Sequence, residues 1–222
     1  MTKTQAVERT KRVREMHGAL KKLFPTHTIE LLYSTPWELM VAVQLSAQCT
    51  DKRVNIVTKT LFKKYKTFKQ YVVAHEGEFA NDIKSCGFYR SKARNILGAA
   101  RYLSEKYNGE IPRTIAELVL IPGVARKTAN VILANLYDLH EGIAVDTHIR
   151  RFAIRFDLSD FTDPVRIERD LMVVVPQKEW WDFHHRLVLY GRYYCKARPH
   201  ECLAHPLTKF YEKAAKNWPK SK

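Results

Sequence analysis

Two residues of this sequence are best suited to covalent chemistry. Lys127 follows a Pro-Gly turn in "LIPGVARKTANVIL" (120–133), and Asp146 lies in "VDTHIRR" (145–151). Lys127 falls in the first turn of an expected helix, where the helix dipole is positive. The dipole and the adjacent Arg126 favour a neutral amine, which is a nucleophile toward a sugar C1′ and forms a Schiff base there. A nearby carboxylate would stabilise a cationic sugar or carry protons, but Asp146 is equally suited to capping a helix.

The same stretch predicts a phosphate-binding turn. A short helix over 114–121, a Pro-Gly turn and a helix over 126–139 together form a helix–hairpin–helix. Glycine supplies a backbone conformation that other residues resist, and the start of the second helix then presents free N–H groups to an anion. Such contacts hold a phosphate without reading a base. The groups expected to make them are the backbones of Gly123 and Ala125 and the side chains of Arg126 and Thr128. The alternative is a helical corner with incidental cations.

Composition favours a polyanionic partner. The 222 residues hold 38 Lys+Arg against 23 Asp+Glu, a net charge of +15. Nucleic acid is the favoured partner and an anionic membrane surface the alternative. No apolar run approaches the length of a membrane-spanning helix, and the N-terminus lacks the apolar core of a signal peptide. Four cysteines in a chain of this length fit a reducing compartment. We expect a cytoplasmic monomer, associated with the nucleoid in a prokaryote.

Helical periodicity dominates, and strand signals are nearly absent, so the sequence predicts an all-α fold. Several starts and stops carry recognisable signals, such as Asp163-Pro164 at a start and Asn108-Gly109 at a stop. The N-terminal segment 1–24 is expected to form a basic amphipathic helix, and the other expected helices cover 36–48, 51–65, 91–107, 114–121, 126–139, 146–158, 163–175 and 180–195.

The hairpin followed by "AVDTHIRR" resembles the signature of the endonuclease III family of DNA glycosylases. Further segments resemble family segments in the same order: "STPWELMVAVQLSAQCTD" (34–51), "GFYRSKARNI" (87–96), "YNGEIP" (107–112) and "HHRLVLYGRYYC" (184–195). The resemblance implies two helical domains with a DNA-binding cleft between them. Residues 29–140 would form a helical barrel domain that contains the hairpin. Residues 1–28 and 141–222 would form a discontinuous second domain.

The resemblance also implies an activity and residue roles. Lys127 and Asp146 match the catalytic pair of bifunctional enzymes, which excise a base and then nick at the abasic sugar. Gln48 matches the residue that enters the gap left by a flipped base, and Phe88 occupies the wedge position. The expected function is a base-excision-repair DNA glycosylase with AP lyase activity. It would remove damaged, mainly oxidised, pyrimidines from duplex DNA through a lysine Schiff base. Two alternatives stay open: a mismatch or uracil-type glycosylase on the same fold, and a non-catalytic DNA-binding hairpin protein.

Two departures from the family pattern concern the hairpin and the C-terminus. Ala125 stands where relatives usually have glycine, which would be costly if that position needed a positive φ. Relatives commonly end with four cysteines that hold a [4Fe–4S] cluster. Here Cys195 and Cys202 keep the first spacing, while His205 and Tyr211 occupy the other two positions. A four-thiolate cluster needs cysteines there, so we expect no cofactor. The weaker alternative is another metal on Cys195, Cys202 and His205.

Basic residues in the same C-terminal loop are expected to contact the DNA backbone whether or not a metal is present. They are Lys196 and Arg198, together with His200.

Overall fold

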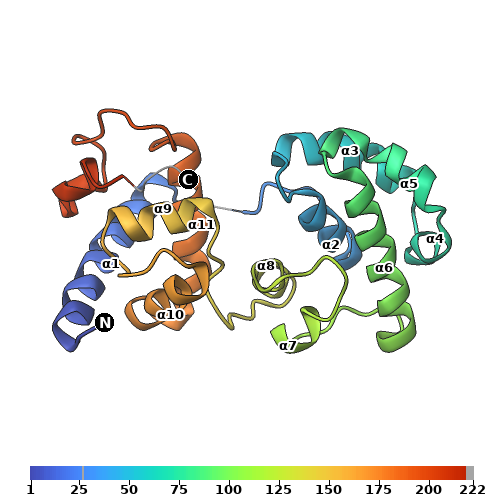
Figure 1. Cartoon of the computed structure of the whole chain (residues 1–222), viewed down its shortest axis with the longest axis horizontal. Coiled ribbons are helices and arrows are strands. Elements are labelled where there is room, and N and C mark those ends of the chain that lie inside the picture. The colour runs from blue at the N-terminus through green and yellow to red at the C-terminus, as the bar shows by residue number, and fades with distance from the viewer. Residues whose placement is uncertain (27, 219–222) are drawn as a thin grey trace. The chain divides into compact units, whose positions relative to one another are not determined.

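The computed structural model describes residues 1–26 and 28–218, and the described chain is helical without β-strands (Figure 1). This confirms the predicted all-α fold. The chain divides into two compact units: a central unit of Ile29–Glu141 and a terminal unit of Met1–Thr28 with Gly142–Lys222. The last four residues of the basic tail "KNWPKSK" lie outside the described residues. No helix among the described residues is long and apolar enough to cross a membrane.

The central unit is built around α2, an apolar helix that is buried on most faces. It packs against α3, α6 and α8 (Figure 1). Its hydrophobic core includes Leu39, Met40, Ile96 and Leu133, none of which is exposed. The helices of this unit are α2 (Pro36–Leu45), α3 (Asp51–Lys64), α4 (Phe68–Val73), α5 (Glu76–Asp82), η1 (Lys84–Cys86), α6 (Tyr89–Tyr107), α7 (Ile115–Leu118) and α8 (Arg126–Tyr137).

The terminal unit joins the first helix of the chain to the last ones. The helix α1 packs against α10 and α11, and α9 also packs against both. Buried Arg9 ties α1 to the loop after α9, since its Nη2 lies 2.9 Å from Asp157 Oδ1 and 2.6 Å from Asp160 Oδ1. The helices of this unit are α1 (Lys3–Leu23), α9 (Thr147–Arg155), α10 (Pro164–Val174), η2 (Gln177–Glu179), α11 (Trp180–Tyr193), η3 (Thr208–Phe210) and η4 (Glu212–Ala215).

Candidate active site

The hairpin between α7 and α8 requires glycine at one position. Gly123 has φ +78°, in the left-handed region that favours glycine. A Cβ there would lie 2.5 Å from Gln44 Oε1 and 2.8 Å from Asn95 Cβ. Buried Ile121 and Val124 flank the turn and anchor it in the core of the central unit. The turn is therefore fixed by backbone conformation, by apolar anchors and by a close approach of its neighbours.

Ala125 occupies an ordinary backbone conformation. It is the N-cap of α8 with φ −87° and ψ 168°, so the alanine causes no left-handed strain. Its side chain has no polar atom, so this N-cap residue makes no side-chain cap hydrogen bond. The first backbone bond of the helix runs from Ala129 N to Ala125 O. Because the first N–H groups of a helix have no intrahelical acceptor, the start of α8 can accept an anion.

The three side chains at the start of α8 differ in exposure. Arg126 and Lys127 are exposed and Thr128 is half-buried. The next residues, Ala129 and Asn130, are buried, so the helix turns inward directly after Lys127. The Lys127 amine is thus carried on the exposed first turn of a helix whose remaining length is packed in the core.

Asp146 caps α9 in the terminal unit. Its Oδ1 accepts a hydrogen bond of 2.8 Å from Ile149 N, and its backbone carbonyl accepts one of 2.8 Å from Arg150 N. The side chain is half-buried. Asp146 therefore caps a helix, which is one of the two roles that its sequence position suggested. The hydrogen bond also fixes the orientation of its carboxylate.

Gln48 and Phe88 share an uncommon backbone conformation. Gln48, in the turn after α2, has φ +52°, and Phe88, just before α6, has φ +46°. The other non-glycine residues with positive φ in the described chain are Asn or Asp, which tolerate this region much better. Both side chains are exposed, that of Phe88 by 66%. Residues with strained backbone cluster at functional sites, where the surrounding structure imposes the conformation.

A buried lysine connects the two loops that carry Gln48 and Phe88. Lys92 Nζ donates hydrogen bonds of 2.8 Å to both Leu45 O, at the end of α2, and Cys86 O, at the end of η1. The side chain is buried, and burial lowers the pKa of Lys92. The sequence interpretation assigned Lys92 no role, because nothing in its local pattern distinguishes it from a surface lysine of α6.

Next to these carbonyls, the Cys86 thiol is also buried. Burial raises the pKa of Cys86 to about 11, and the adjacent Cys49 adds to the rise. Both cysteines are free, so the two loops are joined here by non-covalent contacts.

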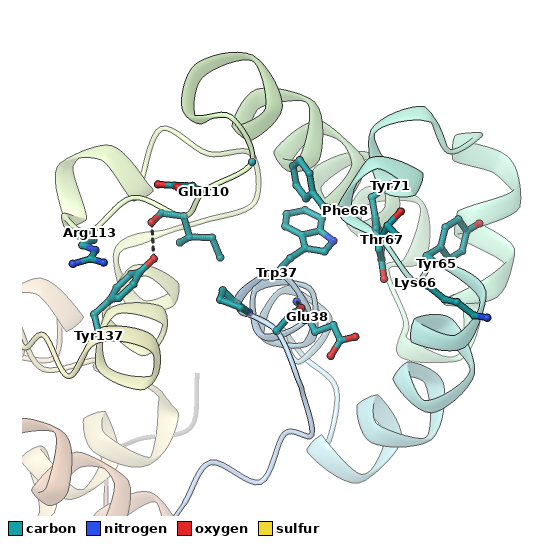
Figure 2. Close-up of a pocket in the computed structure, with 14 residues that line it drawn as sticks. Trp37, Glu38, Tyr65, Lys66, Thr67, Phe68, Tyr71, Glu110, Arg113 and Tyr137 are labelled. Atoms are coloured by element: carbon teal, nitrogen blue, oxygen red, sulfur yellow. Dashed lines mark hydrogen bonds between the residues drawn. The ribbon is translucent and has the colours of Figure 1, made fainter.

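A pocket of about 430 Å³ lies elsewhere in the central unit (Figure 2). The rings of Trp37 and Phe68 meet edge to face across it, and Tyr137 donates a hydrogen bond of 2.6 Å to Ile111 O at its rim. Its walls include the start of α2 and the end of α8, whereas Lys127 lies at the start of α8. A helix of this length separates its two ends by about 16 Å, so this pocket does not contain Lys127.

Comparisons with known proteins agree with the hairpin geometry. A family model described as the HhH-GPD superfamily base excision DNA repair protein matches residues 41–177. Endonuclease III of Synechocystis is 47% identical over 191 residues, which cover 86% of this chain and 87% of that protein. Endonuclease III of Bacillus subtilis is 48% identical and covers 83% of this chain and 84% of its own. The chain belongs to the endonuclease III family.

Solved structures extend the comparison. A trapped endonuclease III–DNA covalent intermediate has a TM-score of 0.87 and 42% identity, covering 93% of this chain and 97% of that chain. A non-covalent endonuclease III–DNA complex gives the same values. A thermostable thymine-DNA glycosylase, with a TM-score of 0.77 and 20% identity, shares the fold alone.

The expectation from the sequence that the protein holds no cofactor is wrong, as the C-terminal loop shows. Members of this family normally carry a [4Fe–4S] cluster. In this chain, ligand atoms of Cys195, His200 and His205 all lie within 4.8 Å of one another, so the loop offers a group that can hold a metal. The expectation failed because it counted thiolates at the family's cysteine positions and passed over His200. Lys196 and Arg198, between the ligands, are exposed.

Cys202 is not part of that three-residue group, although the weaker sequence alternative had included it. Its Sγ accepts a hydrogen bond of 2.9 Å from Arg155 Nη2, while Arg155 Nη1 donates one of 2.8 Å to Cys195 Sγ. The terminal unit supplies two thiol groups, so a metal bound here would take its remaining protein ligands from other residue types.

Proposed function

We propose that Lys127 is the nucleophile and Asp146 the supporting carboxylate of a DNA glycosylase with AP lyase activity. This activity serves base excision repair, and its partner is duplex DNA that contains damaged bases or abasic sites. The observation that carries the assignment is the exposed Lys127 amine on an uncapped helix start, directly after the Gly123 turn. The related endonuclease III forms a trapped covalent intermediate with DNA, which is the chemistry this lysine would perform.

The reaction begins at the sugar of the damaged nucleotide. Lys127 Nζ attacks C1′, the N-glycosidic bond breaks, and its electron pair leaves with the base, which takes up a proton. The sugar ring then opens as the C1′–O4′ bond breaks, and O4′ takes up the proton that the amine loses, which leaves a protonated Schiff base at C1′. Removal of a C2′ proton then drives β-elimination, in which the C3′–O bond breaks and the 3′ phosphate leaves. Water finally releases the lysine.

Asp146 contributes charge and orientation. Positive charge develops at the sugar as the base leaves, and a carboxylate with a fixed position stabilises that charge without having to reorganise. The hydrogen bond from Ile149 N supplies that fixed position. The same carboxylate is suited to carrying the protons that the amine loses.

The hairpin and the two loops of the central unit bind the DNA. The uncapped N–H groups around Gly123 and Ala125 bind a phosphate, supported by Arg126 and Thr128. Gln48 and Phe88 enter the base stack when the damaged nucleotide is extruded. Their left-handed backbone holds these side chains away from the core of the central unit. In the terminal unit, the exposed Lys196 and Arg198 add phosphate contacts.

In this proposal the two units act as the two domains of a glycosylase, and the central one contains the hairpin. Damaged, mainly oxidised, pyrimidines are the substrate class. The cytoplasm, beside nucleoid DNA, is the site of action, in keeping with the bacterial origin of the relatives.

Borohydride trapping tests the nucleophile. Borohydride reduces a Schiff base to a stable amine, so the native protein should form a covalent adduct with a duplex that carries an oxidised pyrimidine. Lys127→Ala should lose the adduct while it still binds DNA. Lys59→Ala, an exposed lysine of α3 in the same unit, is the matched control and should trap normally. An undiminished adduct with Lys127→Ala would place the nucleophile elsewhere.

A panel of duplexes tests the substrate class. Oxidised pyrimidine, uracil and guanine–thymine mismatch duplexes would be compared at equal enzyme concentration by strand nicking. Preference for the oxidised pyrimidine supports the assignment. Preference for uracil or the mismatch would replace it with the alternative glycosylase specificity, and binding without nicking of any duplex would leave only a DNA-binding protein.

A further inference from the structure

Two histidine nitrogens in the C-terminal loop are buried and have no partner. His200 Nε2 and His205 Nδ1 make no hydrogen bond among the described residues and are closed off from solvent. A buried polar atom without a hydrogen bond is costly, so such atoms call for an explanation, and a bound ion is one of those known. The two histidines that carry these nitrogens belong to the group of possible metal ligands formed with Cys195.

The orientation of His200 suits metal binding. Its Nδ1 lies 2.7 Å from Arg198 O, an interaction in which the ring nitrogen donates its proton to the carbonyl. A neutral ring that donates from Nδ1 carries its free lone pair on Nε2, which is the atom without a partner. Metal-binding histidines characteristically use their second ring nitrogen in this way, because the hydrogen bond fixes both tautomer and orientation.

The backbone of the loop also holds the ligands in place. His205 N donates to Cys202 O at 3.0 Å, and Thr208 Oγ1 donates to the same carbonyl at 2.6 Å. The His200 ring contacts the rings of His205 and Trp218, with centroid separations of 5.2 and 5.3 Å. The loop is thus ordered around the ligand atoms by contacts that do not use those atoms.

Arg155 completes the surroundings of the sulfur atoms. Its guanidinium is 1% exposed and donates to both Cys195 Sγ and Cys202 Sγ. Hydrogen bonds of this kind to sulfur are a common feature around metal–thiolate centres. Cys202 Sγ lies outside the three-residue group, but the same guanidinium contacts its sulfur and that of Cys195, and on that ground we infer that it is the fourth donor.

The geometry points to a metal centre held by mixed ligands, the sulfurs of Cys195 and Cys202 and the imidazole nitrogens of His200 and His205. A metal at this end of the chain is a family property, whereas histidine ligation is particular to this sequence. Two sulfurs and two nitrogens suit a single zinc ion, and an iron–sulfur centre with two histidine ligands also has this donor set. The zinc ion and the iron–sulfur centre would be bound in the same way, by thiolate and imidazole ligands that suit borderline-soft cations. The inference does not depend on the proposed reaction of Lys127.

Metal content in two variants tests the ligands. The full chain would be expressed with zinc and iron supplied, and then assayed for zinc, iron and acid-labile sulfide. The native protein should carry metal in near-stoichiometric amount, and the double variant His200→Ala/His205→Ala should lose at least about 90% of it because two of four ligands are gone. His75→Ala, an exposed histidine of the central unit, is the matched control and should keep it. Zinc without sulfide would indicate a single ion and iron with sulfide a cluster; in either case, loss of the metal in the double variant supports histidine ligation.

A measurement on the native protein covers the case in which the double variant fails to fold. X-ray absorption at the metal edge should show both nitrogen and sulfur neighbours, with the multiple scattering of imidazole rings. All-sulfur coordination, a native protein without metal, or full metal retention in the folded double variant would each overturn the inference. These assays measure metal content and coordination and not DNA nicking. Their outcome is therefore separate from the outcome of the tests of base excision.

Discussion

The hairpin provides the sharpest mutational prediction, because exchanging glycine and alanine at two nearby positions should be costly at one position and nearly neutral at the other. Gly123→Ala adds one methyl group where φ is +78° and where the new Cβ would lie 2.5 Å from Gln44 Oε1. Ala125→Gly removes one methyl group two residues later, where φ is −87°. The second change restores the glycine that the family usually has at this position, so it serves as the matched control.

The magnitude follows from two costs at Gly123. A left-handed conformation costs a non-glycine residue about 1–2 kcal/mol. Forcing a methyl group against buried neighbours adds about 1–3 kcal/mol. Together they predict a loss of about 2–5 kcal/mol, or a fall in Tm of about 5 to 20 °C for a chain of this size. Ala125→Gly should cost less than about 1 kcal/mol, since it only adds backbone freedom in the unfolded chain.

Thermal unfolding and fluorescence anisotropy with an abasic duplex measure the two effects. We expect Gly123→Ala to unfold earlier and, at a temperature where it is folded, to bind DNA more weakly. The Ala125→Gly variant should match the native protein in both assays. The reasoning would be refuted if Gly123→Ala kept native stability and affinity, or if the two variants lost stability equally.

Three further results are expected. Asp146→Asn keeps a competent N-cap but loses the charge, so nicking should fall roughly a hundredfold at unchanged Tm, whereas Asp163→Asn, the equivalent cap of α10, should leave nicking unchanged. DNA affinity should fall with salt at a log–log slope of about −4 to −7, corresponding to roughly five to eight neutralised phosphates, and a slope near zero would contradict the electrostatic argument. Lys92→Met leaves two buried carbonyls without their donor, so denaturant unfolding should show a loss of about 1–3 kcal/mol. Burial lowers the pKa of Lys92 below its ordinary 10.5. Between the lowered pKa and 10.5 the amine is neutral in the folded protein and protonated in the unfolded chain, so unfolding takes up a proton. The stability difference between the native protein and the Met variant should therefore grow as pH rises toward 10.5, because Cys86, whose raised pKa acts in the opposite direction, is common to both proteins.

Helix positions were predictable where the signal is local. Asp163 caps α10 with Pro164 in its first turn, and Asn108 ends α6 in the left-handed conformation, as their residue types indicate. The start of α6 was misplaced: the sequence suggested Ser91, but the helix begins at Tyr89 after left-handed Phe88. A phenylalanine in that conformation cannot be expected from local preference, because the surrounding structure must impose it.

Residues that act across the sequence were harder to find. The hairpin is contiguous, so its turn and the position of Lys127 can be read from one short segment. Lys92 instead joins two carbonyls that precede it by 47 and by 6 residues, and a buried lysine on an amphipathic helix looks like any surface lysine. Its burial depends on how α2 and η1 end beside α6, which is a property of the tertiary fold.

The metal ligands show most clearly what a motif comparison omits. Counting cysteines at family positions gave two thiolates and a gap, and His200 stood outside that count because it falls between the two cysteines. What qualifies His200 is its orientation: Nδ1 is bonded to Arg198 O, and Nε2 is left buried and free. That orientation arises from an irregular loop, which has no periodicity to predict it. In the sequence, the change from cysteine to histidine ligands therefore looks like the loss of a metal site. The replacement is recognisable only in the structure, where both histidines lie close to Cys195.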